Sequence, residues 1–227
     1  MACRSDPAGR LRRVALGLLL AATALLTACG GPAYTYVTNS DDRTYLRVPN
    51  SWQPIDTAAL GAALGLDPST TTRAQGFWLA GYDADASPST AHILGPHSPA
   101  PAMFIGVQDV PPQLRGQVSL DVLRDFFRPV SNSGRQRAAA NPMSPYSAFA
   151  LMSDEVLTPG AGLRGVHSVY QYRIQGGPAQ VFDQTLYVND DASKLFMLYV
   201  RCSTQCYADR QQEITSVVSS FTVRENP

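Results

Sequence analysis

The chain has 227 residues, of which 44% are hydrophobic and 16% are charged, so it is long enough for one globular domain with a substantial core. Its formal net charge is zero, but four arginines and one aspartate give residues 1–28 a charge of +3, which leaves −3 for the remainder. A mildly acidic remainder lacks the basic surface that nucleic acid requires, so nucleic acid is excluded as an expected partner.

The first 28 residues have the parts of a secretory signal. A basic stretch ends at Arg12-Arg13, and an apolar run of 13 residues follows from Val14 to Leu26. A helix of that length is too short to cross about 30 Å of hydrocarbon. The arginine pair also permits twin-arginine export, but the loose pattern around it favours the general secretion route.

The next residues, Leu26-Thr27-Ala28-Cys29-Gly30, resemble the lipobox of bacterial lipoproteins. The resemblance implies cleavage between Ala28 and Cys29, a diacylglyceryl thioether on Cys29 and often a third acyl chain on the new amino group. Two or more chains give stable anchoring. We therefore expect residues 29–33 to be a lipidated cysteine with a short tether, and the cell membrane's extracytoplasmic face to be the location. The alternative is an ordinary signal peptide with an accidental cysteine.

The first part of the remaining chain alternates short strands with short helices and irregular segments. Strand-forming residues lie on either side of the turn-rich Asn39–Asp42, and Asp56 can cap a helix. We expect strands at 34–38, 43–48, 77–82 and 102–110, helices at 56–64 and from Ser119 to about Phe127, and irregular segments at 83–101 and 129–145.

The last third is a run of strands that ends in an amphipathic helix. We expect strands at 148–157, 166–174, 181–188 and 195–202, and a helix at 205–219 whose apolar face holds Ile214, Val217 and Phe221. Consecutive strands with short links favour an antiparallel sheet flanked by helices. The sequence therefore predicts one α+β domain over residues 34–227.

Two cysteines remain once Cys3 and Cys29 are assigned to the signal and the lipid. They are Cys202 and Cys206, in Cys-Ser-Thr-Gln-Cys. An even number of cysteines outside the cytoplasm predicts a disulfide. Free thiols are the alternative, while a zinc site would need further ligands nearby and a redox site a closer spacing.

Both ends of the domain resemble PsbP-like domains. Residues 45–52, Tyr-Leu-Arg-Val-Pro-Asn-Ser-Trp, are similar to their opening strand, and residues 214–223 are similar to their last helix and terminal Ser-Phe signature. With the lipobox, the chain resembles actinobacterial lipoproteins of the LpqN type best. The middle of the chain matches in element order only, Thr44 replaces a common glycine, and the loops are long. The resemblance implies the fold and a partner-binding role.

Catalytic motifs are not evident. His92 and His97 lie in a Pro-rich loop, and His167 starts a strand. Acidic pairs such as Asp190-Asp191 lie where turns are expected, and no Gly-rich phosphate loop occurs. We expect neither a metal nor a cofactor, and a satisfied or exposed strand residue at His167. Strand aromatics are expected mainly in the core, although some could line a groove.

These observations predict a non-catalytic binding or accessory module of the cell envelope, with an envelope protein, glycan or lipid as its partner. The alternatives are an envelope hydrolase with a non-obvious site, or a carrier of a lipid or another apolar ligand. A histidine or serine clustered with an aspartate in a cleft would favour the hydrolase. A deep apolar cavity would favour the carrier, and a shallow apolar patch would favour a protein partner.

Overall fold

The computed structural model describes residues 33–160 and 162–224, and the described residues from Tyr34 onward group into one unit. The strands are β1 Tyr34–Asn39, β2 Thr44–Pro49, β3 Gln53–Ile55, β4 Phe77–Asp83, β5 Ala102–Asp109, β6 Tyr146–Gly160, β7 Leu163–Ile174, β8 Ala179–Asn189, β9 Lys194–Ser203 and β10 Thr222–Val223. The helices are α2 Thr57–Ala63, α3 Thr90–Leu94, α4 Leu120–Arg124, α5 Asn132–Ala140, α6 Thr204–Asp209 and α7 Gln211–Val218, with 3-10 helices at Arg73–Gln75 and Pro112–Gln117.

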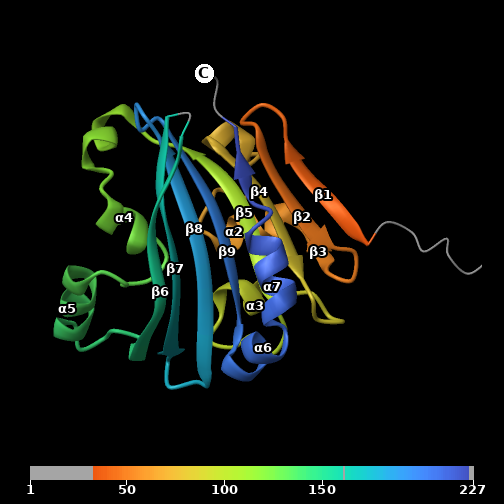
Figure 1. Ribbon diagram of the computed structural model, residues 1–227, viewed down its shortest axis with the longest axis vertical. Coiled ribbons are helices and arrows are strands. Elements are labelled where there is room, and N and C mark those ends of the chain that lie inside the picture. The colour runs from red at the N-terminus through yellow and green to blue at the C-terminus, as the bar shows by residue number, and fades with distance from the viewer. Residues whose placement is uncertain (1–32, 161, 225–227) are drawn as a thin grey trace, which may run out of the picture. The chain divides into compact units, whose positions relative to one another are not determined.

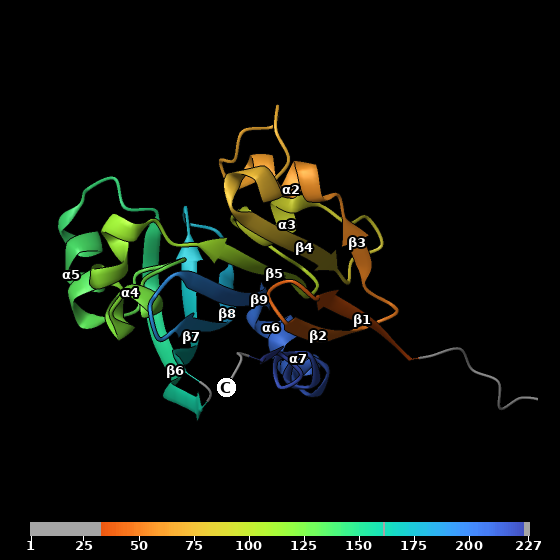
Figure 2. The same cartoon turned by 90° about the horizontal axis from the view of Figure 1, so that it is seen from above.

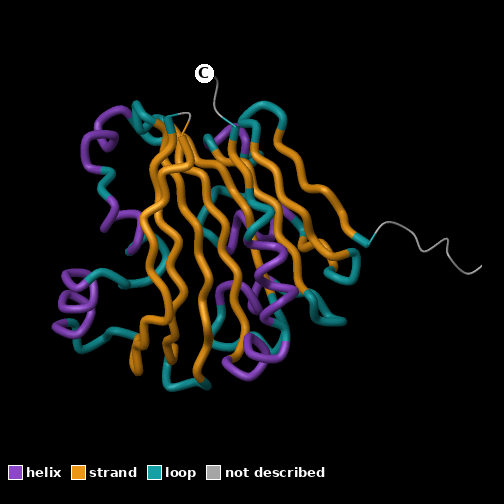
Figure 3. The backbone as a smooth tube through the Cα atoms, viewed as in Figure 1, coloured by secondary structure: helices purple, strands orange, loops and turns teal. Residues whose placement is uncertain are grey.

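Seven strands form one antiparallel sheet in the order β3-β4-β5-β9-β8-β7-β6, and β1, β2 and β10 form a second, smaller sheet. Figure 1 shows the long strands β6 to β9 side by side, with α7 on the near side of the sheet next to β9. Figure 3 shows how short the helices are beside these strands. The predicted α+β class with a mainly antiparallel sheet is confirmed.

Alternation along each strand gives the large sheet two buried faces, because successive side chains point to opposite sides. Phe196, Leu198 and Val200 of β9 pack with α7 and the small sheet, and we call this side the α7 face. Leu195, Met197 and Tyr199 pack with residues of α2, α3 and α4, and we call this side the α4 face. The strands consequently read as near-continuous apolar runs, as two-sided burial requires. Figure 2 shows the helices on both sides of the sheet.

Several helical regions differ from their predicted form. The segment 83–101, expected to be irregular, contains α3, and the helix expected from Ser119 to about Phe127 ends at Arg124. The segment 129–145, expected to be irregular, contains α5, whose first turn is capped by the Ser131 side chain on the Gly134 amide. The expected helix 205–219 is divided at Arg210, whose φ of −116° is not helical, into α6 and α7. The division lets α6 turn away from the end of β9 while α7 runs along the sheet (Figure 1).

Strand β6 lies at the open edge of the large sheet and is irregular. Its pairing with β7 shifts register at Ser147/Ala150, Leu151/Ser153 and Leu157/Gly160, and Ala148 has a φ of 53°. Such bulges bend a strand and increase its twist. Most side chains of β6 are exposed, in contrast to those of β7, β8 and β9.

Candidate binding groove

A groove of about 300 Å³ lies on the α7 face, where α6 and α7 leave the outer part of the sheet uncovered. Its floor comes from β6, β7 and β8 and its wall from the two helices. The residues that line it are Leu157, His167, Val169, Asp183, Thr185, Tyr187, Tyr207, Thr215, Val218, Ser219 and Phe221. Its size is at the lower end of small-molecule sites, and its lining combines apolar side chains with a few polar groups, as such sites do.

Asp183 is the polar centre of the groove. Its side chain is 5% exposed, and both carboxylate oxygens have partners. His167 Nε2 lies 2.8 Å from Oδ1, and the Tyr207 hydroxyl donates to Oδ2 at 2.8 Å. A carboxylate held by two such partners in a poorly solvated place is fixed in orientation.

Local sequence explains why these groups meet. Strands β7 and β8 are joined by a tight turn with glycines at 176 and 177, and the resulting register pairs His167 with Thr185 and Val169 with Asp183. His167 and Asp183 are therefore diagonal neighbours on one face of the sheet, within reach of each other's side chains. Tyr207 arrives from α6, which begins immediately after β9.

The electrostatics of the groove favour a charged imidazole. The hydrogen bond to Asp183 is the largest influence and raises the pKa of His167 above its ordinary value; burial opposes the shift, while the charges of Asp183 and Glu155 add to it. Burial, followed by the charge of Asp183, raises the pKa of Tyr207, so its hydroxyl stays protonated and donates. The groove can thus present a cationic imidazole beside apolar walls.

Two hydroxyl-bearing residues in α7 and directly after it also line the groove. These are Thr215 and Ser219, and the Ser219 hydroxyl donates to the Ser216 carbonyl at 3.4 Å. Within residues 33–160 and 162–224, Asp183 is the group that hydrogen-bonds the His167 ring, and the ring does not hydrogen-bond any hydroxyl. His167 Nδ1 therefore has no hydrogen-bond partner among these residues.

The apolar walls are formed by residues from both sides of the groove. Tyr187 and Phe221 face each other with ring centroids 5.7 Å apart, and Val169, Val218 and Leu157 continue the apolar surface. Burial raises the pKa of Tyr187, so this hydroxyl is also neutral. A ligand with an apolar body and one hydrogen-bonding or anionic group would match this lining.

The sequence-predicted site residues have different outcomes. Ala28 and Cys29 lie outside the described residues, so the cleavage and lipidation predictions remain predictions. The predicted disulfide is not formed: Cys202 and Cys206 are both free, buried thiols. The two thiols are hydrogen-bonded to each other, and this contact together with burial raises the pKa of Cys202. The last residues of β9 and the first turn of α6 bring the thiols together without a covalent bond.

The other two histidines have structural partners. His92 Nδ1 lies 2.7 Å from the buried Asp83, and His97 Nδ1 lies 3.1 Å from the Gln180 amide nitrogen. No group of three or more His, Cys, Asp or Glu that could hold a metal ion occurs among the described residues. Across the same residues, no helix is long and apolar enough to cross a membrane.

The sequence left open that strand aromatics line a groove but did not place His167 and Asp183 in it. The prediction of a satisfied or exposed strand residue at His167 agrees with the Asp183 contact. The aromatic residues were assigned mainly to the core, and Tyr170, Tyr172 and Tyr199 are indeed buried there on the α4 face. Tyr187 instead lines the groove. The signal that could have revealed the site is the glycine turn after β7, which fixes the faces on which His167 and Asp183 lie.

No known family model and no curated protein sequence matches this chain. Among solved structures, PsbP of the cyanobacterium Synechocystis superposes with a TM-score of 0.51 at 14% identity, covering 87% of this chain and 96% of that one. This similarity shows a PsbP-like fold.

Two further structures match with lower scores. LpqN, described as involved in cell envelope biogenesis of Mycobacterium tuberculosis, has a TM-score of 0.43 at 15% identity, covering 84% of this chain and 90% of that one. The Ran-binding protein Mog1p of Saccharomyces cerevisiae has a TM-score of 0.41 at 10% identity, covering 85% and 96%.

Proposed function

We propose that this chain is the precursor of an exported lipoprotein whose PsbP-like domain is a non-catalytic binding module of the cell envelope. The lipobox supports cleavage between Ala28 and Cys29 and a lipid on Cys29. The groove beside α7 supports the binding role, and the observation that carries it is the buried Asp183 holding His167 and Tyr207 in an apolar-walled recess. The ligand class is an envelope molecule that offers an apolar portion and a hydrogen-bonding or anionic group to His167.

Site-specific photo-crosslinking in intact cells tests the groove. A photoreactive amino acid at Thr215, in the groove wall, should give adducts that mass spectrometry identifies as one recurring partner. The matched control is the same amino acid at Met143, which is 85% exposed and lies outside the groove. Adducts should disappear when His167→Ala is added to the Thr215 variant. Equal adducts at both positions, or adducts unaffected by His167→Ala, would contradict binding in the groove.

The lipid anchor is tested separately by Cys29→Ala. Acyl-chain labelling should mark the unchanged chain and leave the variant unlabelled and released from the membrane fraction. Cys3→Ala is the matched control, because Cys3 lies at the start of the signal and should not affect labelling. A labelled, membrane-bound Cys29→Ala protein would overturn the lipoprotein assignment without affecting the test of the groove.

A second candidate function is hydrolysis, which the His167–Asp183 pair beside Thr215 and Ser219 favours. An aspartate that orients a histidine is two-thirds of a nucleophile-activating triad. Under the binding proposal, the purified protein turns over no substrate in a panel of esters, peptides and glycosides. A turnover that Ser219→Ala or Thr215→Val abolishes, and that Ser220→Ala leaves unchanged, would replace binding by hydrolysis.

A further inference from the structure

Arg201, at the end of β9, is fully buried on the α4 face of the large sheet. Its Nη1 donates to the carbonyls of Ile93, at 3.2 Å, and Gly95, and its Nη2 donates to Gln180 Oε1 at 2.9 Å. Its Nε is buried and has no hydrogen-bond partner. Among the described residues, the acceptors of this cation are therefore neutral oxygens, and its Nε–H group has no acceptor.

A second arginine, Arg128, stands beside the same aromatic ring. The guanidinium carbons of Arg201 and Arg128 lie 5.1 and 5.5 Å from the centroid of Phe182. Arg128 Nη1 donates to the Phe127 carbonyl at 2.8 Å, while its Nε is buried without a partner. Arg128 also lies 5.6 Å from the ring centroid of Tyr146, and both of these residues are partly exposed. Of the two arginines, Arg128 therefore lies near the surface, whereas the guanidinium of Arg201 is wholly buried.

The hydroxyl of Tyr199 completes the group. It is buried and has no hydrogen-bond partner, although Tyr199 lies two residues from Arg201 on the same face of β9. Its ring centroid lies 5.9 Å from that of Phe182, the ring against which both guanidinium groups lie. Three donors without partners thus occur in one part of the core.

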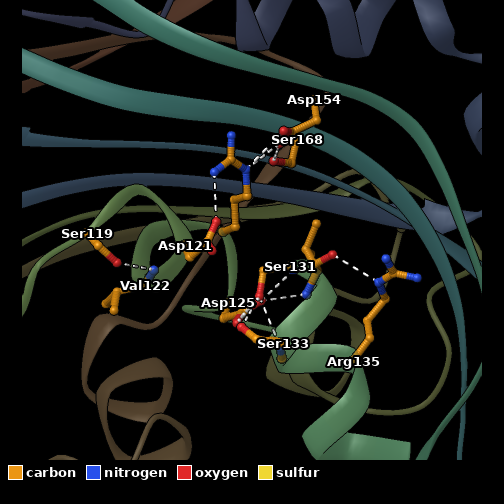
Figure 4. Close-up of polar contacts among 12 residues, drawn as sticks. Ser119, Asp121, Val122, Asp125, Ser131, Ser133, Arg135, Asp154 and Ser168 are labelled. Atoms are coloured by element: carbon orange, nitrogen blue, oxygen red, sulfur yellow. Dashed lines mark hydrogen bonds and ion pairs between the residues drawn. The ribbon is translucent and has the colours of Figure 1, made fainter.

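Carboxylates near this part of the α4 face are already paired elsewhere. Figure 4 shows Asp121 and Asp154 on either side of the arginine that ends α4, and Asp125 turned towards Ser131. That arginine is Arg124, whose Nε lies 2.9 Å from Asp154 Oδ2. Asp125 accepts from the Ser131 hydroxyl and from the amides of residues 130 and 131. No carboxylate lies within 4.0 Å of Arg128 or Arg201 among residues 33–160 and 162–224.

This arrangement carries an electrostatic cost. Arginine keeps its proton at any physiological pH, so burial cannot neutralise the two guanidinium groups. A buried charge without an opposite charge is strongly destabilising, and a buried hydroxyl without a partner adds a further penalty. Stacking on Phe182 and hydrogen bonds to neutral carbonyls offset the cost of burying the two cations only in part. An oxyanion would satisfy the two guanidinium Nε–H groups and the Tyr199 hydroxyl together.

We propose that Arg128, Arg201 and Tyr199 form a binding site for a small oxyanion, entered beside Arg128 and Tyr146 and independent of the groove on the α7 face. The shared chemistry is a compact group with two or three acceptor oxygens, supplied either by a carboxylate or by a phosphate. The segment that carries Arg128 is fixed at both ends by the Arg124–Asp154 and Asp125–Ser131 contacts (Figure 4), so the site is organised before the anion arrives.

The test is the thermal midpoint of the full-length chain in zwitterionic buffer at constant ionic strength, with sodium chloride replaced stepwise by sodium acetate or sodium phosphate. The midpoint should rise saturably with an oxyanion, because a ligand of the folded state stabilises it by mass action. A rise with acetate alone identifies a carboxylate site, and a rise with phosphate alone identifies a phosphate site. A rise with both establishes the shared chemistry. No saturable rise over chloride would overturn the proposal.

Two variants assign the effect to these residues. Tyr199→Phe should weaken the apparent oxyanion affinity about tenfold, equivalent to about 1.4 kcal/mol, and Arg128→Met should abolish the saturable rise. The matched control is Arg135→Met, since Arg135 also stacks on an aromatic ring, that of Phe149 at 4.4 Å, but its Nε donates to the Val130 carbonyl. Unchanged oxyanion affinity in a folded Tyr199→Phe protein, or an equal loss in Arg135→Met, would overturn the assignment.

Discussion

The two faces of the large sheet differ in how the charges buried on them are compensated. On the α7 face the buried group is a carboxylate, Asp183, and its oxygens are bound by His167 and Tyr207. On the α4 face the buried Asp83 is likewise bound, by His92. The partly exposed Arg128 and the fully buried Arg201, however, have only neutral oxygens as acceptors in the described chain. The two aspartates are compensated from within the chain, whereas the two arginines are not.

The difference indicates which face depends on a molecule from outside. A buried charge that the chain itself compensates contributes to specifying the native arrangement, and removing one partner is costly. A buried charge without compensation lowers stability until a ligand supplies the opposite charge. We therefore expect the α7 face to respond to mutation and pH, and the α4 face to respond to the anion in the buffer.

The largest effect should follow from Asp183→Ala. The substitution leaves His167 and Tyr207 without their shared acceptor in a buried place, and we expect the free energy of unfolding to fall by about 3 kcal/mol. Urea unfolding monitored by tryptophan fluorescence measures it. The control is Thr185→Ala, two residues along the same strand and also buried. Its free energy of unfolding should fall by much less. Similar losses in both variants would show that the Asp183 contacts contribute little.

Arg124→Met should give the next largest loss. Arg124 holds α4 against β6 through Asp154, and both side chains are largely buried. The Ser168 hydroxyl donates to the same carboxylate at 2.6 Å. We expect a loss of about 1–2 kcal/mol, measured by urea unfolding. High salt should leave most of the difference intact; a difference that vanishes in 1 M salt would mean that the pair is screened as a surface pair is.

The pH dependence of stability should isolate His167. Because the folded pKa of His167 is raised above 6.5, the charged histidine contributes stability that is complete below pH 6.5 and is lost as the pH rises through the folded pKa. We expect about 1 kcal/mol more stability relative to a His167→Gln variant at pH 5.5 than at pH 9. Unfolding titrations at both values measure the difference. If the advantage is greater at pH 9, the charged pair with Asp183 is not stabilising.

Arg128→Met should have the smallest effect on stability, and the sign is informative. Methionine keeps much of the apolar contact with Phe182 and Tyr146 and removes a charge that no carboxylate compensates. In buffer free of oxyanions we expect a change within about 0.5 kcal/mol of zero, or a gain. Comparison with Arg124→Met on the same segment is direct, since only Arg124 has carboxylate partners. An equally large loss would show that Arg128 is compensated within the chain.

Much of the fold was predictable because its strands are long and strongly apolar. Strands β2, β4, β5, β8 and β9 agree with their predicted ranges to within two residues. Helix α5 was missed because Asn132–Ala140 is polar, without an apolar face, and is held by the Ser131 cap and the neighbouring Asp125. The break at Arg210 was missed because the apolar pattern continues across it.

The two candidate sites differ in how well they could be predicted from the sequence. His167 and Asp183 belong to one hairpin, so counting from its glycine turn places them on one face. Arg128 and Arg201 are separated by most of the sheet-forming sequence. They come together at Phe182 only through the position at which α4 packs on the sheet. Tertiary packing of that kind leaves no periodic signal in the sequence.

The irregular edge strand β6 has a consequence for association between copies of the chain. An edge strand with exposed apolar residues, here Leu151, Met152 and Val156, offers free backbone groups to another chain and invites aggregation. The three register shifts and the left-handed Ala148 interrupt that template, and Asp154-Glu155 adds negative charge at its centre. Strand-to-strand association of crowded molecules is therefore opposed by β6 itself, and straightening its bulges should increase aggregation through this edge.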